Sequence, residues 1–186
     1  MKVAIMQPYY YPYAGYFRLF AASDAFVFLD SVQWNRRGRV HRCMTKGKWI
    51  HTLPIKKTHR DTTMIKDMQW QSEKEKPISP VDLIIGTVMD TCEKLDMYFN
   101  CARSSDLKIP DNLHGQDRII AICKKLGATE YINSPGGCHL YDEQIFKDNG
   151  IKLTFLPEWK GSYDSILERL AHEKPEDIRK EIYEQI

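Results

Sequence analysis

Two short apolar stretches near the N-terminus each end in a polar side chain that can do chemistry. Lys2–Met6 is followed by Gln7, and Ala25–Leu29 is followed by Asp30. A carboxylate can act as a general base or bind a sugar hydroxyl, and a carboxamide offers both a hydrogen-bond donor and an acceptor. We therefore predict that Asp30 and Gln7 are catalytic residues of one shared site.

Tyrosines crowd the segment that follows Gln7. The segment contains two prolines, which interrupt regular backbone hydrogen bonding, so we predict a loop. Its rings can form an aromatic wall with phenol groups at its tip. The alternative is that Asp30 only caps a turn and that the tyrosines pack under the following hairpin. In the site hypothesis Tyr16 belongs to the catalytic set, and Tyr10 and Tyr13 contact the substrate.

The segment from residue 31 to residue 60 is strongly cationic. It holds nine lysines or arginines and no acid, whereas the rest of the chain holds eighteen basic and twenty-five acidic residues. A local positive patch on an acidic body attracts phosphate. We predict that Arg36, Arg42 and Lys56 contact a phosphate-bearing substrate, and a solvated hairpin without a ligand remains the alternative.

His41 and Cys43 are two residues apart, so on a strand their side chains point the same way. They form a candidate thiol–imidazole pair with His41 as a catalytic residue, although such a pair is often incidental. The spacing of His41, His51 and His59 does not suit a compact metal site, so no metal is expected. Five scattered cysteines without a Cys-x-x-Cys pair argue against a disulfide framework and a zinc site, and a cofactor remains unknown.

The pattern of elements predicts an α/β fold in a single domain of residues 1–186. Strand, loop, helix and strand follow one another within residues 2–29, which is a βαβ unit and implies a parallel pair. The fold class expected is a Rossmann-like, mostly parallel sheet flanked by helices. It carries a basic antiparallel β-hairpin insertion at about 32–57 and a helical C-terminal end at about 163–186. The best helical pattern is 114–127, which ends in Gly127.

This arrangement brings the two polar strand ends together. Ligands of open α/β sheets lie beyond the carboxyl ends of the strands, and neighbouring parallel strands end at the same edge. No apolar run approaches the roughly 20 residues that span a bilayer, and the apolar start is too short for a secretory signal. We therefore expect a cytoplasmic protein without a membrane span, and the sequence leaves a monomer and an oligomer as open alternatives.

Several blocks of the sequence resemble the WbqC-like family. They include Gln7-Pro-Tyr-Tyr-Tyr-Pro-Tyr-Ala-Gly-Tyr-Phe17, Asp24-Ala-Phe-Val-Phe-Leu-Asp30 and the stretch from Asp117 to Tyr131, and they cover nearly the whole chain. The resemblance implies further framework or substrate-binding positions besides those named above. These positions are Pro8, Gly15, Gln33, Ser105, Asp117, Arg118 and Gly137.

Three departures from the family pattern stand out. His41-Arg-Cys43 occupies the place where an Asn-Arg-Asn triplet is expected, the stretch near 71–80 is short, and the region after Pro157 is shortened. These differences suggest a compact branch with a different substrate, or one that has lost activity.

The leading functional hypothesis is a transferase that acts on a nucleotide-linked or carrier-linked sugar, with Asp30 as the base. The resemblance implies a setting in surface-polysaccharide, O-antigen or specialised-metabolite biosynthesis, by acyl or aminoacyl transfer. A non-catalytic binding or scaffold subunit is the second hypothesis. Nucleic-acid binding through the basic hairpin, with Trp34 and Trp49 stacking on bases, ranks last because the rest of the chain is acidic.

Overall fold

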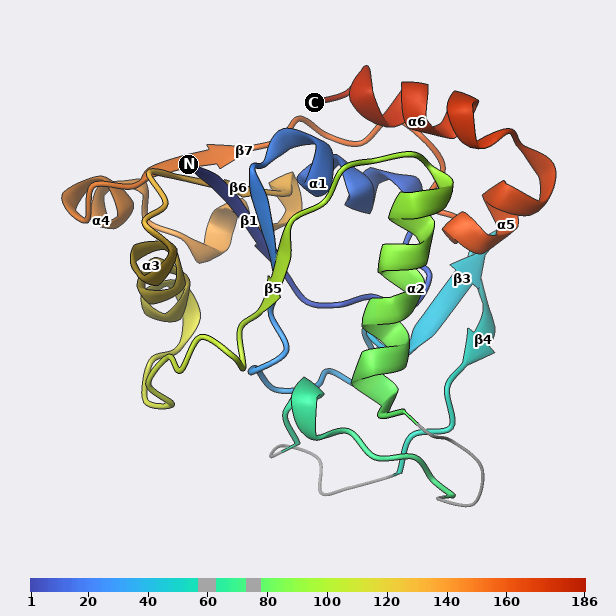
Figure 1. Ribbon diagram of the computed structural model, residues 1–186, viewed down its shortest axis with the longest axis horizontal. Helices are drawn as coiled ribbons and strands as arrows, with labels where there is room; N and C mark the ends of the chain where they lie inside the picture. Colours follow the sequence, from blue (N-terminus) through green and yellow to red (C-terminus); the bar gives the residue numbers. More distant parts are fainter. Residues whose placement is uncertain (57–62, 73–77) are drawn as a thin grey trace.

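The computed structural model of the chain describes residues 1–56, 63–72 and 78–186 (Figure 1). Its main sheet has five strands, all parallel, in the order β5-β2-β1-β6-β7. The predicted fold class is confirmed. The strands are β1 (Lys2–Met6), β2 (Ala25–Phe28), β5 (Cys101–Arg103), β6 (Glu130–Asn133) and β7 (Lys152–Phe155).

The central strand β1 explains why the sheet is buried on both faces. Successive side chains of a strand point to opposite faces, so Ala4 joins one apolar cluster while Val3 and Ile5 join the other. The order of the strands reverses here, because the chain passes from β1 to β2 on one side and returns to β6 on the other. This reversal creates a topological switch point at the carboxyl ends of β1 and β6, where ligands of such folds bind.

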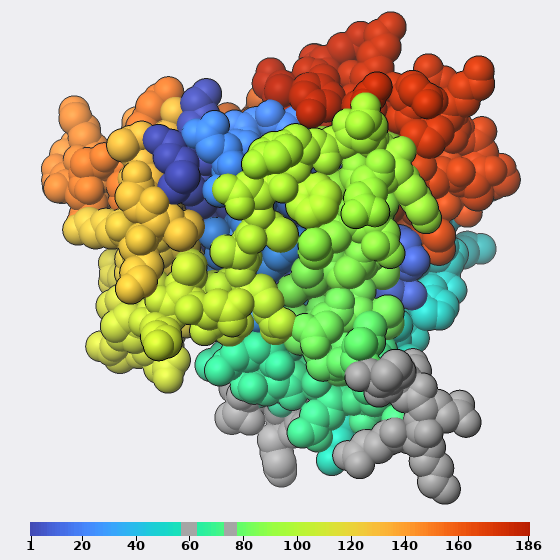
Figure 2. All heavy atoms as spheres, in the orientation of Figure 1, coloured from blue at the N-terminus to red at the C-terminus, as the bar shows by residue number. Residues whose placement is uncertain are grey.

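Helices cover the two faces of the sheet. Leu19, Ile84 and Ile178 belong to the first apolar cluster, and Ile122 and Phe146 belong to the second. In the space-filling view α2 and the chain that follows it cover the centre of one face (Figure 2). The first cluster takes in η1 (Ala14–Phe17), α1 (Arg18–Ala22), η2 (Ile65–Asp67), α2 (Pro80–Lys94), α5 (Ile166–His172) and α6 (Pro175–Tyr183), and the second takes in α3 (Gly115–Leu126) and α4 (Glu143–Asp148).

The predicted antiparallel hairpin is formed by β3 (Arg42–Thr45) and β4 (Lys48–Thr52). Its two-residue turn has positive φ at Lys46 and Gly47, the backbone that such a turn requires. The strands occupy only part of the predicted 32–57 insertion, and Lys57 lies outside the described residues. The backbone N–H of Ser165 donates to the carbonyl of Met44, so the hairpin lies beside α5, on the side of the molecule away from α3 (Figure 1).

Helix boundaries follow their caps. The αL conformation of Gly127 ends α3 at the predicted place. Helix α4 begins after Asp142, whose side chain accepts from Gln144 N and Ile145 N. Residues 135–140, before this cap, form the 3-10 helix η3 (Pro135–Leu140). Within the described residues no helix is both long and apolar enough to cross a membrane.

Candidate functional site

Two cavities open at the carboxyl edge of the sheet. The α3 cavity, of about 520 Å³, lies at the start of α3, and the switch-point cavity, of about 450 Å³, lies where β1 and β6 end. The α3 cavity is lined by Ser31, Val32, Gln33, Met64, Asp111, His114, Gly115 and Arg118. The switch-point cavity is lined by Ile5, Met6, Gln7, Tyr9, Leu29, Asn133, Ser134, Gly136, Gly137, Leu140 and Tyr141.

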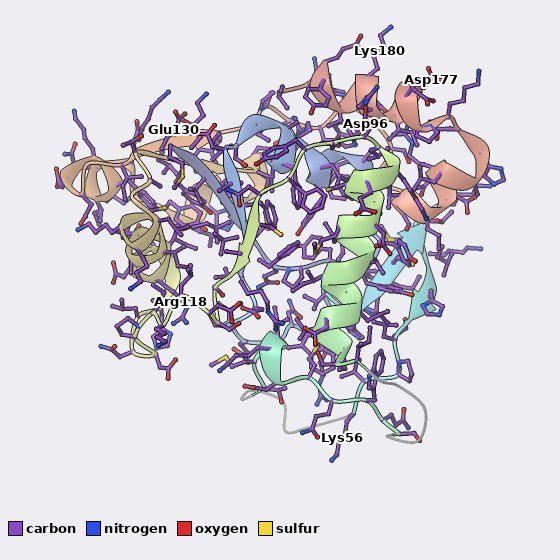
Figure 3. All side chains as sticks on the ribbon, viewed as in Figure 1. Lys56, Asp96, Arg118, Glu130, Asp177 and Lys180 are labelled. Atoms are coloured by element: carbon purple, nitrogen blue, oxygen red, sulfur yellow. The ribbon has the colours of Figure 1, made fainter. Side chains whose placement is uncertain are left out.

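Arg118 is the buried cation of the α3 cavity, and Figure 3 shows it at the base of α3. Only 5% of the residue is exposed. Its Nη2 donates to Ser31 Oγ at 2.8 Å, and its Nη1 donates to the carbonyls of Pro110 and Leu113 at 3.2 Å each. These partners are all neutral, and Nε has no partner among the described residues.

A buried charge without a direct counter-charge is costly, because the protein does not replace the water that solvated it. Arg118 forms no ion pair with a carboxylate in the described part of the chain. The N-terminus of α3 adds a partial positive charge next to it, since Gly115 lines the same cavity. The α3 cavity therefore suits an anionic group. The carboxylates nearby, Asp111 on the cavity wall and Asp117 in the first turn of α3, are exposed.

Asp30 is fully buried, and its carboxylate accepts four hydrogen bonds. Ser104 Oγ and Ser105 N donate to Oδ1 at 3.0 and 2.9 Å, and Arg103 Nε and Ser105 Oγ donate to Oδ2 at 2.8 Å each. A carboxylate offers about four lone-pair sites, so this set saturates it. Asp30 lines neither cavity and acts in this structure as an anchor between the ends of β2 and β5.

A chain of hydroxyl groups joins Asp30 to Arg118. Ser104 donates to Asp30, and its Oγ lies 2.7 Å from Ser31 Oγ, which in turn accepts from Arg118. The position of the guanidinium is thus set by residues from β2, the loop after β5, and α3. The structure brings together four of the predicted positions here, Asp30, Gln33, Ser105 and Arg118.

His114 is a candidate residue that sequence reasoning missed. It lines the α3 cavity, is exposed, and stands at the N-cap position of α3 without a side-chain cap hydrogen bond. Ser, Thr, Asp and Asn are preferred at N-caps because they bond the first free N–H groups. A histidine at that position, directly before a well-formed helix, is the sequence signal that could have identified it.

Gln7 lies in the other cavity, so the two predicted catalytic groups do not meet at one point. The strands that precede Gln7 and Asp30 do pair, with Met6 opposite Phe28. Gln7 lines the switch-point cavity toward β6, whereas the Asp30 carboxylate turns toward β5. Gly137 lines the same cavity as Gln7, and a Cβ there would lie 2.7 Å from Asn133 Nδ2.

The predicted tyrosines pack in the protein interior or against the hairpin. Tyr16 is 2% exposed and donates to the backbone carbonyl of Gln7 at 3.0 Å, and burial raises its pKa well above the usual value. Burial raises the pKa of Tyr10 to about 12, and its ring lies 5.5 Å from that of His51. Tyr13 lies under the guanidinium of Arg39. Gly15 allows this packing, because a Cβ there would lie 2.5 Å from Tyr13 Cε2.

His41 and Cys43 do not hydrogen bond with each other. Trp34 Nε1 donates to His41 Nδ1 at 3.3 Å, and burial, helped by Arg42 and Arg36, lowers the pKa of His41 to about 4. Burial raises the pKa of the Cys43 thiol, which is the wrong direction for a nucleophile. Neither residue lines the α3 or the switch-point cavity.

Arg36, Arg42 and Lys56, predicted to contact a phosphate, are not among the described residues that line either cavity. Arg36 lies over the ring of Trp34 at 5.4 Å and Arg42 over that of Trp49 at 3.9 Å. Lys56 is exposed, contacts Gln69 and stands well apart from Arg118 in Figure 3. In the described ranges no three His, Cys, Asp or Glu side chains gather as a metal site would require.

Comparison with known proteins gives a family and one distant relative. The model of the WbqC-like protein family matches residues 7–79 and 74–169. An uncharacterized protein of Mycobacterium tuberculosis is 25% identical to this chain in an alignment 191 positions long. The alignment covers 83% of this chain and 81% of that protein. No solved structure matches.

Proposed function

This chain belongs to the WbqC-like protein family, and we propose that it is a transferase whose α3 cavity binds a phosphate-bearing sugar, linked to a nucleotide or to a carrier. The observation that carries the proposal is Arg118, a buried guanidinium in a cavity with only neutral partners. A phosphate supplies the missing negative charge and several acceptor oxygens, and guanidinium groups bind phosphate with strong charge-assisted hydrogen bonds.

In this proposal each polar residue of the α3 cavity has a distinct role. Arg118 and the first N–H groups of α3 bind the phosphate. Ser31 orients the guanidinium, and Asp30 is a positioning residue that holds Ser31 through Ser104. Exposed Asp111 stands at the mouth of the cavity, so the anionic end of the substrate lies at the buried end beside Arg118.

We assign the role of general base to His114 and not to Asp30. All four acceptor positions of Asp30 are occupied, whereas the His114 imidazole faces the cavity without a side-chain cap bond to α3. Histidine exchanges protons near neutral pH, which suits a general base that takes a proton from a sugar hydroxyl or amine during acyl or aminoacyl transfer.

A non-catalytic binding subunit is the second candidate. It is favoured because the groups first expected to be catalytic are engaged in the fold. The Asp30 carboxylate is saturated, and His41 accepts from Trp34 and does not hydrogen bond with Cys43. Nucleic-acid binding through the hairpin has less support, since Trp34 is 5% exposed and Arg42 lies over one face of the Trp49 ring, which is itself 43% exposed.

The test combines binding and turnover. The protein is incubated with nucleotide sugars and with coenzyme A thioesters or aminoacyl donors, products are detected by mass spectrometry, and binding is followed by thermal shift. Arg118→Met is expected to abolish the shift caused by nucleotide sugars. His114→Gln is expected to keep that shift and lose turnover, and the exposed His172→Gln on α5 serves as its matched control.

The outcomes separate the candidates. Phosphate ligands that stabilise the wild type and Arg118→Met equally would refute the proposal. Binding that depends on Arg118 without turnover for any donor would favour the binding subunit over the transferase.

A further inference from the structure

The switch-point cavity is uncharged, in contrast to the α3 cavity. None of the side chains that line it is ionic, and its walls come from Ile5, Leu29 and Leu140 together with the rings of Tyr9 and Tyr141. Placing a charged group there would remove its water without supplying a counter-charge. The cavity therefore suits a neutral, flat and partly apolar group.

Two polar side chains of this cavity are held by the fold. Asn133, 4% exposed, accepts from Ser134 N at 2.8 Å. The Tyr141 hydroxyl lies 3.3 Å from that of Tyr131, which contacts the carbonyl of Ile5 at 3.5 Å. These bonds fix the wall of the cavity before any ligand enters.

Gln7 supplies an amide group to this cavity. Its backbone carbonyl accepts from Tyr16, but its carboxamide makes no hydrogen bond within the described ranges of the chain. A carboxamide presents a donor and an acceptor side by side, the pattern that pairs with the edge of a nucleobase. Aromatic side chains such as Tyr9 offer a face on which a base can stack.

The two cavities lie close together along the chain. Leu29 lines the switch-point cavity, and Ser31, two residues later, lines the α3 cavity. Two extended residues span at most about 7 Å. At this point the walls of the two cavities are therefore neighbours in space.

We propose that the switch-point cavity binds the nucleobase of a nucleotide-linked substrate whose phosphates lie against Arg118. The inference rests on the proposed function, and it selects the nucleotide-linked class of substrate over the carrier-linked class. Gln7 reads the edge of the base, and the ring of Tyr141, whose hydroxyl contacts that of Tyr131, sets the plane in which the base lies.

The test separates the two cavities with ligands that fit only one of them. Uridine and adenosine carry a base without a charge, pyrophosphate carries charge without a base, and UDP and ADP carry both. Affinities are measured by calorimetry for the wild type, Gln7→Met and Arg118→Met. Gln7→Met keeps the backbone bond to Tyr16, and its melting temperature checks that the fold is retained.

We expect one of the nucleosides to bind the wild type and to bind Gln7→Met about tenfold more weakly, the effect of losing roughly 1.4 kcal/mol of hydrogen bonding. Arg118→Met leaves that nucleoside unaffected. Pyrophosphate affinity should fall with Arg118→Met and stay unchanged with Gln7→Met. The affinity for the nucleoside diphosphate with the same base should fall with both substitutions.

The inference is overturned if neither nucleoside binds, or if nucleoside affinity is the same with Gln7→Met. Galactose that binds through Gln7 in place of a nucleoside also overturns it. Pyrophosphate binding that ignores Arg118, together with nucleoside binding that needs Gln7, would instead refute the proposed function and leave the base site standing.

Discussion

Asp30 provides a sharp test of whether a predicted catalytic carboxylate is in fact an anchor. Asn has nearly the same shape but one acceptor oxygen, so Asp30→Asn places an NH₂ group against existing donors. If the NH₂ replaces Oδ2, it faces Arg103 Nε, and the ion pair between the buried Asp30 and the partly exposed Arg103, with a separation of 2.8 Å, is lost. Breaking a buried pair by removing one charge costs about 3–5 kcal/mol.

The expected consequence is a large loss of stability. For a chain of this size each kcal/mol lowers the melting temperature by about 2–4 °C, so Asp30→Asn should lower it by roughly 6–20 °C. Asp82→Asn is the matched control, because Asp82 binds the same arginine at 2.6 Å but its side chain is 48% exposed. Exposed pairs contribute about 1 kcal/mol or less, so this control should lose no more than about 4 °C.

The assay is thermal unfolding followed by circular dichroism, with turnover measured on the same samples below the transition. An Asp30→Asn protein that melts like the wild type but has lost all turnover would refute the anchoring role. It would return Asp30 to the catalytic set.

Two further predictions concern the hairpin segment and the switch-point cavity. Burial lowers the pKa of His41 to about 4, below the unfolded value of 6.5, so the unfolded chain binds more protons between these values. The stabilising contribution of neutral His41 is complete above about pH 6.5 and is lost as the pH falls toward 4. Denaturant titrations at several pH values should therefore show that the free energy of unfolding falls less steeply over this range in His41→Gln than in the wild type. Gly137→Ala should cost about 1–3 kcal/mol, because its Cβ would lie 2.7 Å from Asn133 Nδ2. Gly136→Ala, with open space at its Cβ, should be nearly neutral, and equal melting temperatures for the two variants would contradict the packing argument.

The sequence predicted the elements that depend on local patterns. The apolar runs before Gln7 and Asp30 form β1 and β2, and these pair in parallel. Gly127 ends α3 where the helical period stops, because the αL backbone costs glycine little. The edge of the sheet that holds the site was predictable from the same rule, since parallel neighbours end together.

The direction of each side chain at that edge was not predictable. The donors that saturate Asp30 come from residues 103–105, far along the sequence, so only the folded chain reveals that the carboxylate is occupied. Arg118 sits in a helical pattern among isoleucines, and nothing in that pattern says that its partners are neutral. The switch point could be located only from the strand order β2-β1-β6, and a single sequence does not reveal that order.

The cationic hairpin lies apart from the phosphate site that we propose. Between residues 31 and 60 the excess of lysine and arginine suggested a flap over the strand ends. In the structure Arg36 and Arg42 lie over neighbouring indole rings, and the hairpin contacts the chain that leads into α5. Arg118, which lies outside this patch, is buried with neutral partners, so an anion would stabilise it more than it would the arginines of the hairpin.

The most direct measurement is calorimetric titration of pyrophosphate into the wild type, Arg118→Met and Lys56→Met at one fixed salt concentration. A buried cation in the binding site predicts that Arg118→Met weakens binding by about 10- to 150-fold, corresponding to roughly 1.5–3 kcal/mol for hydrogen bonds to a charged group. Lys56→Met should stay within about twofold of the wild type, as expected for an exposed charge. Binding that survives Arg118→Met but falls with Lys56→Met would contradict this account and assign the phosphate to the basic surface.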